Sequence, residues 1–158
     1  MATKGRNIGL SSLIKEKYIK MDLRENKKNK LLAELVDFIA KSGKLKDKKS
    51  FLNALVKREK LGSTGIGNGV AIPHAKSERV RDFILAFARH NQGVDFGALD
   101  GEKTYLFFVL ASSADEVGNH LKILAEISRL VKDKFIVENL KKAKDKKEIL
   151  KIISTYGS

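Results

Sequence analysis

Two nearly continuous apolar runs most restrict the fold of this chain of 158 residues. They cover residues 83–88 and 105–111. A strand with one face in water alternates apolar and polar residues, so unbroken runs of this length are typical of strands buried on both faces. A shorter strand is predicted at residues 70–72, ending at Pro73. A sheet built from such strands needs helices on both sides.

Amphipathic segments before the strands supply part of that cover. Apolar residues recur at helical spacing in residues 10–18 and again in residues 27–42. A further helix is expected to begin at Asp47 or Ser50 and to end before Gly62. Residues 91–103, between the two apolar runs, are rich in turn-forming residues.

The segment after the last strand predicts another helix. Ser112 or Ser113 could form a capping box with Asp115 or Glu116, and apolar residues follow at helical spacing through residue 131. Two short helical stretches finish the chain. We therefore predict an α/β sandwich, with a mixed β-sheet flanked by helices on both faces.

Length and composition favour one domain over residues 1–158, without internal repeats or linkers. The chain has no cysteine, which excludes disulfides, thiolate metal sites and cysteine nucleophiles, and its three histidines leave little for a metal site. We expect no metal and no cofactor. The first residues do not resemble a signal peptide and no run could span a membrane, so we predict a cytoplasmic protein without membrane insertion.

The net charge of +13 is unevenly distributed. Residues 1–60 carry 17 basic and 7 acidic side chains, whereas residues 61–130 carry 7 and 8. Lysine supplies most of the excess and commonly solvates helix faces. A nucleic-acid interface is the alternative, but no recognition-helix or aromatic RNA-binding pattern accompanies the charge, so we do not expect nucleic acid as a partner.

The segment most suggestive of chemistry is Ser-Thr-Gly-Ile-Gly-Asn-Gly at residues 63–69, followed by a short strand, Pro73 and His74. Alternating glycines let backbone N–H groups approach phosphate oxygens, although they could equally form a structural turn. Neither the dinucleotide fingerprint nor the P-loop pattern fits. His74 raises the interest of the segment, because imidazole can accept and pass on a group near neutral pH.

This segment resembles a known family. The run LGSTGIGNGVAIPHAK, preceded by LVKRE and followed by GVDFGALDG and NHLKILAEISRL, is similar to the enzyme IIA domain of the fructose–mannitol class of the sugar phosphotransferase system, including its nitrogen-regulatory relatives. The resemblance covers nearly the whole chain. It implies the α/β sandwich fold already predicted and a phosphotransferase activity that needs no cofactor.

The resemblance also implies site residues. His74 would accept a phosphoryl group, with His120 as the second active-site histidine and Arg58, in LVKRE, as the active-site arginine. The phosphate-binding loop would include Thr64, Gly65, Gly67 and Gly69. Apart from the resemblance, His120 could simply occupy the first turn of a helix. His90, after a buried strand, is expected to be incidental, and Ser63 and Thr64 could either cap or contact phosphate.

Two functions follow from the resemblance. In the first, the chain takes a phosphoryl group from phospho-HPr and transfers it to a IIB component in sugar uptake. In the alternative, it is a regulatory nitrogen-type protein whose phosphorylation state controls binding to a kinase, transporter or transcription regulator, with no sugar-specific IIB acceptor. The expected partners are therefore an HPr-type donor and either a IIB domain or a regulatory target.

Overall fold

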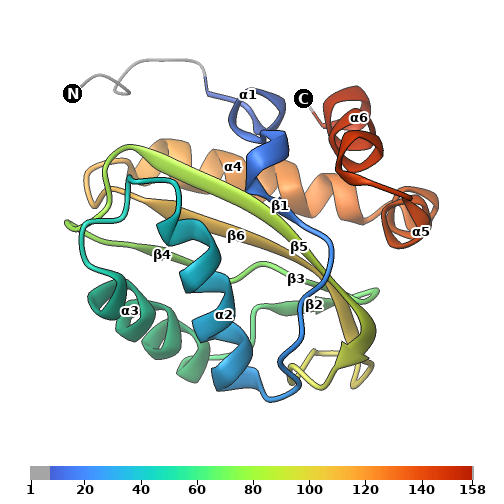
Figure 1. Cartoon of the computed structure of the whole chain (residues 1–158), viewed down its shortest axis with the longest axis horizontal. Coiled ribbons are helices and arrows are strands. Elements are labelled where there is room, and N and C mark those ends of the chain that lie inside the picture. Colours follow the sequence, from blue (N-terminus) through green and yellow to red (C-terminus); the bar gives the residue numbers. More distant parts are fainter. Residues whose placement is uncertain (1–7, 158) are drawn as a thin grey trace.

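The computed structural model describes residues 8–157, which form a mixed β-sheet between two layers of helices (Figure 1). The strand order is β1-β5-β6-β3-β2, and β4 also pairs with β6. The strands are β1 (Ile19–Lys20), β2 (Gly65–Gly67), β3 (Val70–Ala71), β4 (His74–Lys76), β5 (Phe83–Val94) and β6 (Thr104–Ser112). The α-helices are α1 (Leu10–Leu13), α2 (Lys28–Ala40), α3 (Lys48–Lys60), α4 (Val117–Val131), α5 (Lys134–Lys142) and α6 (Lys146–Tyr156). The predicted α/β sandwich is confirmed.

The two apolar runs form the centre of the sheet. β5 and β6 pair antiparallel, and successive side chains point to opposite helix layers. Phe87 and Phe108 contribute to the core under α1, α4, α5 and α6, whereas Phe107 and Val109 contribute to the core under α2 and α3. Figure 1 shows the two layers on either side of the strands. Both faces are buried, which explains why the runs lack polar alternation.

The short strand predicted before Pro73 is present as β3, which ends at Ala71, and a second short strand, β4, begins directly after the proline. Both β3 and β4 run parallel to β6, with Val70 opposite Leu106 and His74 opposite Leu110. Pro73 has no N–H to donate, but its carbonyl accepts a 3.0 Å hydrogen bond from the Leu110 N–H. Pairing therefore resumes at His74, close to the end of β6 from which the chain turns into α4.

Other boundaries also differ from the predictions. Residues 10–18 form α1 and a separate 3₁₀ turn (Glu16–Tyr18), because the backbone at Ile14 is extended with φ −74° and ψ 134°. β5 continues to Val94 through residues predicted as turns, with an irregularity in its pairing after Arg89. Asp47 caps α3 by accepting a hydrogen bond from the Ser50 N–H, as one predicted start requires.

The start of α4 lacks the predicted capping box. Its N-cap is Glu116, which makes no side-chain cap hydrogen bond. Ser112 ends β6, and the Ser113 hydroxyl instead donates to the Asp115 carboxylate at 2.8 Å. The two serines therefore belong to the strand end and the loop that lead into α4.

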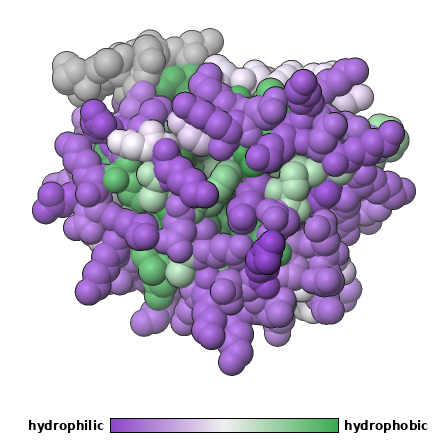
Figure 2. All heavy atoms as spheres, in the orientation of Figure 1, coloured by the Kyte–Doolittle hydropathy of each residue, from purple (hydrophilic) through white to green (hydrophobic). Residues whose placement is uncertain are grey.

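Hydrophilic side chains cover most of the face shown in Figure 2, with smaller hydrophobic areas between them. This agrees with the high charge content of the chain, 32%. Among residues 8–157, no helix has both the length and the apolar composition needed to cross a bilayer.

Candidate functional site

His74 begins β4, and its ring is held by the backbone just before it. Nδ1 lies 2.7 Å from the carbonyl oxygen of Ile72, which can only accept. In the neutral ring Nδ1 therefore carries the hydrogen and Nε2 keeps its lone pair. Burial lowers the pKa of His74 from its usual 6.5, more than the Ile72 carbonyl raises it. A neutral ring with a free Nε2 is the nucleophilic form of histidine.

His120 lies in the first turn of α4, beside His74. The two ring centroids are 5.6 Å apart. The hydroxyl of Ser112, the last residue of β6, lies 2.6 Å from Nδ1 of His120. His120 is only 2% exposed, and burial lowers its pKa to about 4, with a further contribution from His74 and Lys76. The ring is therefore neutral at pH 7 despite its position among polar groups.

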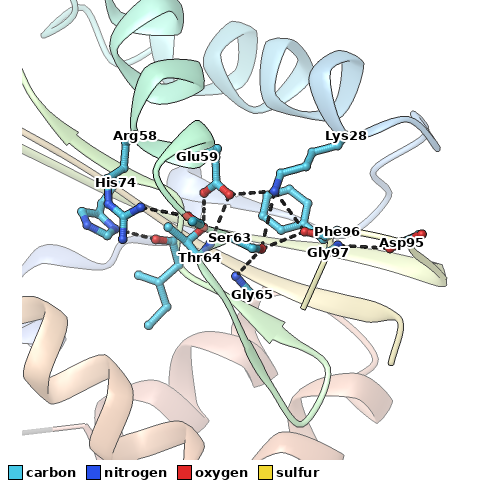
Figure 3. A network of polar contacts seen from close by, with 12 residues as sticks. Lys28, Arg58, Glu59, Ser63, Thr64, Gly65, His74, Asp95, Phe96 and Gly97 are labelled. Carbon is cyan, nitrogen blue, oxygen red and sulfur yellow. Dashed lines mark hydrogen bonds and ion pairs between the residues drawn. The ribbon is translucent and has the colours of Figure 1, made fainter. Parts of the chain in front are cut away.

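Arg58 lies in the last turn of α3, and Figure 3 shows its guanidinium beside the His74 ring. Its Nη1 donates a 2.9 Å hydrogen bond to the carbonyl of Gly62. This contact holds the side chain across the end of the helix, and the guanidinium keeps further N–H donors for an anion.

These three residues line one cleft of about 400 Å³. Its lining is Ala54, Lys57, Arg58, Leu61, His74, Ala75, Lys76, His120, Leu121 and Leu124. Among the described residues, the charged side chains that line the cleft are Lys57, Arg58 and Lys76, and no acidic side chain lines it. Cations without competing carboxylates suit a group with negative charge on several oxygens, such as a phosphoryl group.

The glycine-rich segment forms a β-hairpin rather than a loop around the histidines. β2 pairs with β3, and the turn between them places Asn68 and Gly69 at φ 58° and 79°. The Gly69 carbonyl accepts hydrogen bonds from the Tyr105 and Leu106 N–H groups. Gly69 borders a different cavity, of about 640 Å³, and none of the three glycines lines the His74 cleft.

Thr64, at the base of this hairpin, lies closer to the cleft through the backbone. Its carbonyl accepts a 3.0 Å hydrogen bond from the Ile72 N–H, two residues before His74. Its own N–H and hydroxyl both donate to the buried carboxylate of Glu59. The phosphate-binding role of Thr64 and the three glycines stays a prediction.

Sequence reasoning missed several residues that shape the site. Lys76 lines the cleft, Ser112 fixes His120, and Glu59 pairs with Lys28 next to Arg58. Glu59 could have been noticed because it follows Arg58 in LVKRE. Lys28 gave no signal, since it is one of many lysines in residues 1–60.

The remaining histidine lies outside the cleft. His90 is 1% exposed, and its Nε2 lies 3.1 Å from Oδ1 of Asn26. Within residues 8–157, no three His, Cys, Asp or Glu side chains are placed together as ligands for a metal ion.

A family model for EIIA 2 of the phosphoenolpyruvate-dependent sugar phosphotransferase system matches residues 12–156. The chain belongs to this family. An EIIA 2 relative, the fructose-specific EIIABC component of Bacillus subtilis, is 34% identical over 93% of the chain, and the chain spans 23% of its length. The nitrogen regulatory protein of Bradyrhizobium diazoefficiens is 33% identical over 92% of the chain and 94% of its own length.

A solved structure agrees with this assignment. The nitrogen regulatory protein IIA-Ntr of Neisseria meningitidis superposes with a TM-score of 0.85 at 31% identity, covering 90% of this chain and 97% of that protein. The EIIA 2 family thus includes sugar-specific and nitrogen-regulatory relatives at similar identity to this chain. Both expected functions remain within the family.

Proposed function

We propose that this EIIA 2 chain is a phosphocarrier that accepts a phosphoryl group on Nε2 of His74 from the phosphohistidine of an HPr-type protein. The observation that carries the proposal is the 2.7 Å contact between Nδ1 and the Ile72 carbonyl. It leaves Nε2 as the nitrogen available to the cleft, and burial keeps the ring neutral. A carrier of this kind requires no metal or cofactor.

The transfer is an in-line exchange between two imidazoles. The Nε2 lone pair of His74 forms the new P–N bond while the P–N bond of the donor breaks, and that electron pair returns to the donor's ring nitrogen. Charge on the three phosphoryl oxygens must be stabilised while this happens. Arg58 offers its guanidinium N–H groups from the same cleft.

His120 supplies a neutral donor in this scheme. If the Ser112 hydroxyl donates to Nδ1, then Nε2 of His120 carries the hydrogen and can donate to a phosphoryl oxygen. Because the pKa of His120 is about 4, this N–H comes from imidazole and not from imidazolium. A neutral donor stabilises the incoming group without trapping it, which suits a carrier that must pass the group on.

The cleft also indicates what kind of partner docks. Lys57, Arg58 and Lys76 line it together with the apolar Leu61 and Leu121, which are 85% and 59% exposed. Exposed leucines among cations favour a partner whose phosphorylated residue is surrounded by apolar and acidic side chains. The HPr-type donor and the IIB or regulatory acceptor are both expected to have this character.

Intact-mass measurement after incubation with phosphoenolpyruvate, enzyme I and HPr tests the acceptor. We expect one added phosphoryl group on the wild type and none on His74→Gln. His120→Gln serves as the matched control, because it alters the neighbouring ring but leaves the acceptor, and it should still be phosphorylated at a lower rate. Equal phosphorylation of His74→Gln and wild type would refute the proposal.

A second experiment separates the two functions. A regulatory role is supported by the similarity to two nitrogen regulatory proteins, at 33% and 31% identity. Labelled phosphoprotein is mixed with a fructose-type IIB domain and the label is followed. Transfer to IIB supports sugar uptake, whereas retention on His74 with IIB present favours the regulatory alternative.

A further inference from the structure

An ion pair between α2 and α3 lies next to Arg58, at the end of α3. The Lys28 ammonium, from α2, is 2.9 Å from the Glu59 carboxylate, from the last turn of α3. Only 4% of the Glu59 side chain is exposed. Figure 3 shows Glu59 between the His74 ring on one side and the Lys28 ammonium on the other. Neither residue lines the His74 cleft, so neither would touch the phosphoryl group.

Lys28 is held in place by more than this pair. Its ammonium donates a 3.0 Å hydrogen bond to the Phe96 carbonyl and lies 4.3 Å from the centre of the Phe96 ring. The Ser63 hydroxyl donates to the same carbonyl at 2.8 Å. These contacts fix the cation over the segment that leads from α3 into β2.

A chain of hydrogen bonds leads from Glu59 to His74. The carboxylate accepts from the N–H of Thr64, at 3.1 Å, and from its hydroxyl. The Thr64 carbonyl accepts from the Ile72 N–H, and the Ile72 carbonyl faces Nδ1 of His74. Ile72, whose carbonyl sets the tautomer of His74, is therefore hydrogen-bonded to Thr64, the residue before β2, and Thr64 is anchored to Glu59.

Glu59 also follows Arg58 in the chain, so the same anchor fixes the end of α3 that carries the guanidinium. The Glu59 carboxylate is buried, whereas the Lys28 side chain is 28% exposed. Burying a carboxylate costs hydration, and an apolar group of similar size would often stabilise a fold as well. Stability alone therefore gives little reason for charges here. A second reason for the charges is their position, because Glu59 follows Arg58 in the chain and is linked through Thr64 to Ile72.

We propose that Glu59 is a positioning residue for His74, that it holds Arg58 and the Ile72 carbonyl in register, and that Lys28 balances its charge. The inference rests on the proposed role of His74 as acceptor. The Glu59 carboxylate raises the pKa of His74, against the lowering by burial and by Arg58. Removing either member of the pair should thus change the basicity of His74, and in opposite directions.

The test follows the His74 ring by NMR titration in Glu59→Gln, Lys28→Met and wild type. Glu59→Gln removes an anion and leaves the Lys28 cation, so the pKa of His74 should fall by about 0.5 to 1 unit. Lys28→Met leaves the anion unbalanced, so the pKa should rise. Glu126→Gln is the matched control, because Glu126 is another buried glutamate but accepts from the Leu10 N–H.

Phosphorylation rates complete the test. Glu59→Gln should accept the phosphoryl group about tenfold more slowly than wild type, because the geometry of acceptor and guanidinium is loosened. Glu126→Gln should match wild type in both measurements. Shifts of one sign in both pair variants, or a rate for Glu59→Gln equal to that of Glu126→Gln, would overturn the inference.

The two readouts also separate this inference from the proposed function. The titration needs no donor protein, so opposite shifts without phosphorylation of wild type would leave the coupling intact and refute the carrier role. If Glu59→Gln does not fold, Lys28→Met alone tests the inference, which requires that the pKa of His74 rises in this variant. Lys28→Arg keeps a cation at this position and should therefore have the wild-type pKa.

Discussion

The rings of His74 and His120 lie 5.6 Å apart, with 58° between their planes, and each uses Nδ1 for a contact inside the protein. His74 contacts the Ile72 carbonyl and His120 contacts the Ser112 hydroxyl. Both rings thereby leave Nε2 for the shared cleft. In the proposed transfer, His74 is the nucleophile and His120 the donor, and both rings are neutral at pH 7 because burial lowers their pKa values.

The first prediction concerns the pH dependence of phosphoryl acceptance. The pKa of His74 lies below 6.5, and only the neutral ring reacts, so more than half of the protein is competent at pH 6.5. Single-turnover rates with excess phospho-HPr should therefore exceed half of their maximum at pH 6.5 and fall only at lower pH. A midpoint above pH 6.5, after correction for the donor's own titration, would contradict the prediction.

The second prediction concerns acid stability. The pKa of His120 is about 4 in the folded protein, below its usual 6.5, so the unfolded chain binds the proton more readily. The stabilisation is present above pH 6.5 and is lost as the pH falls toward 4. Between these limits the free energy of unfolding of wild type should fall by about 3 kcal/mol more than that of His120→Gln.

Denaturant titrations at several pH values measure this difference. Comparison with the variant is needed because carboxylates also protonate in this range. Parallel pH dependence of the two proteins would show that His120 titrates normally.

The third prediction concerns Ser112, which is fully buried. Ser112→Ala removes the partner of Nδ1 of His120, so the N–H is no longer directed to Nε2 and the transfer rate should fall about tenfold. A buried nitrogen without a partner should also lower the free energy of unfolding by about 1 to 3 kcal/mol. Ser113→Ala, which alters the next hydroxyl along the chain, should leave the rate unchanged.

The fourth prediction concerns ionic strength. Because three cations line the cleft, association with an acidic partner should slow as salt screens them. The second-order rate of phosphorylation by phospho-HPr should fall with added salt, and Lys57→Gln should lower it at low salt. Lys147→Gln, an exposed change on α6, is the control. A rate independent of salt would argue against an acidic partner.

The fifth prediction separates two roles of the glycine-rich segment. A side chain on Gly69 would be strained at φ 79° and would lie 3.3 Å from the Tyr105 ring, so Gly69→Ala should destabilise the fold by about 1 to 2 kcal/mol. If the glycine serves the hairpin, the rate of phosphoryl acceptance should stay at the wild-type level. Gly101→Ala, at φ 74° with no atom within 4 Å, controls for backbone strain.

A loss of rate in Gly69→Ala beyond that in Gly101→Ala would favour a phosphate-binding loop. Thermal unfolding measures the stability of both variants, and single-turnover phosphorylation measures their rates of phosphoryl acceptance.

Much of the fold followed from local patterns. The apolar runs predicted β5 and β6 because burial on both faces leaves a direct mark on composition, and helical spacing predicted α2 and α3. The continuation of β5 beyond Ala88 could not be predicted from the sequence. Its residues there are mostly polar, and they are extended because β5 pairs with β6. The strand β4 after Pro73 was not predicted either, because only the position of β6 shows that pairing resumes at His74.

Some residues of the candidate site could be predicted from the sequence, and others could be found only in the structure. His74, His120 and Arg58 were reached through a family resemblance, and the structure brings all three to one cleft. Lys28 could not have been found, because its link to Glu59 depends on how α2 packs against α3. Ser112 is eight residues before His120, and only the turn from β6 into α4 brings the two together.

The short outer strands of the sheet also affect whether the protein aggregates at high concentration. β1 has two residues and β2 has three, and the Gly65 carbonyl of β2 is already bonded to the Leu99 N–H. An outer strand of this length offers few free groups to a strand of another molecule. The apolar strand β6 lies inside the sheet, between β5 on one side and β3 and β4 on the other. This segment is thus protected from pairing with another molecule for as long as the fold persists.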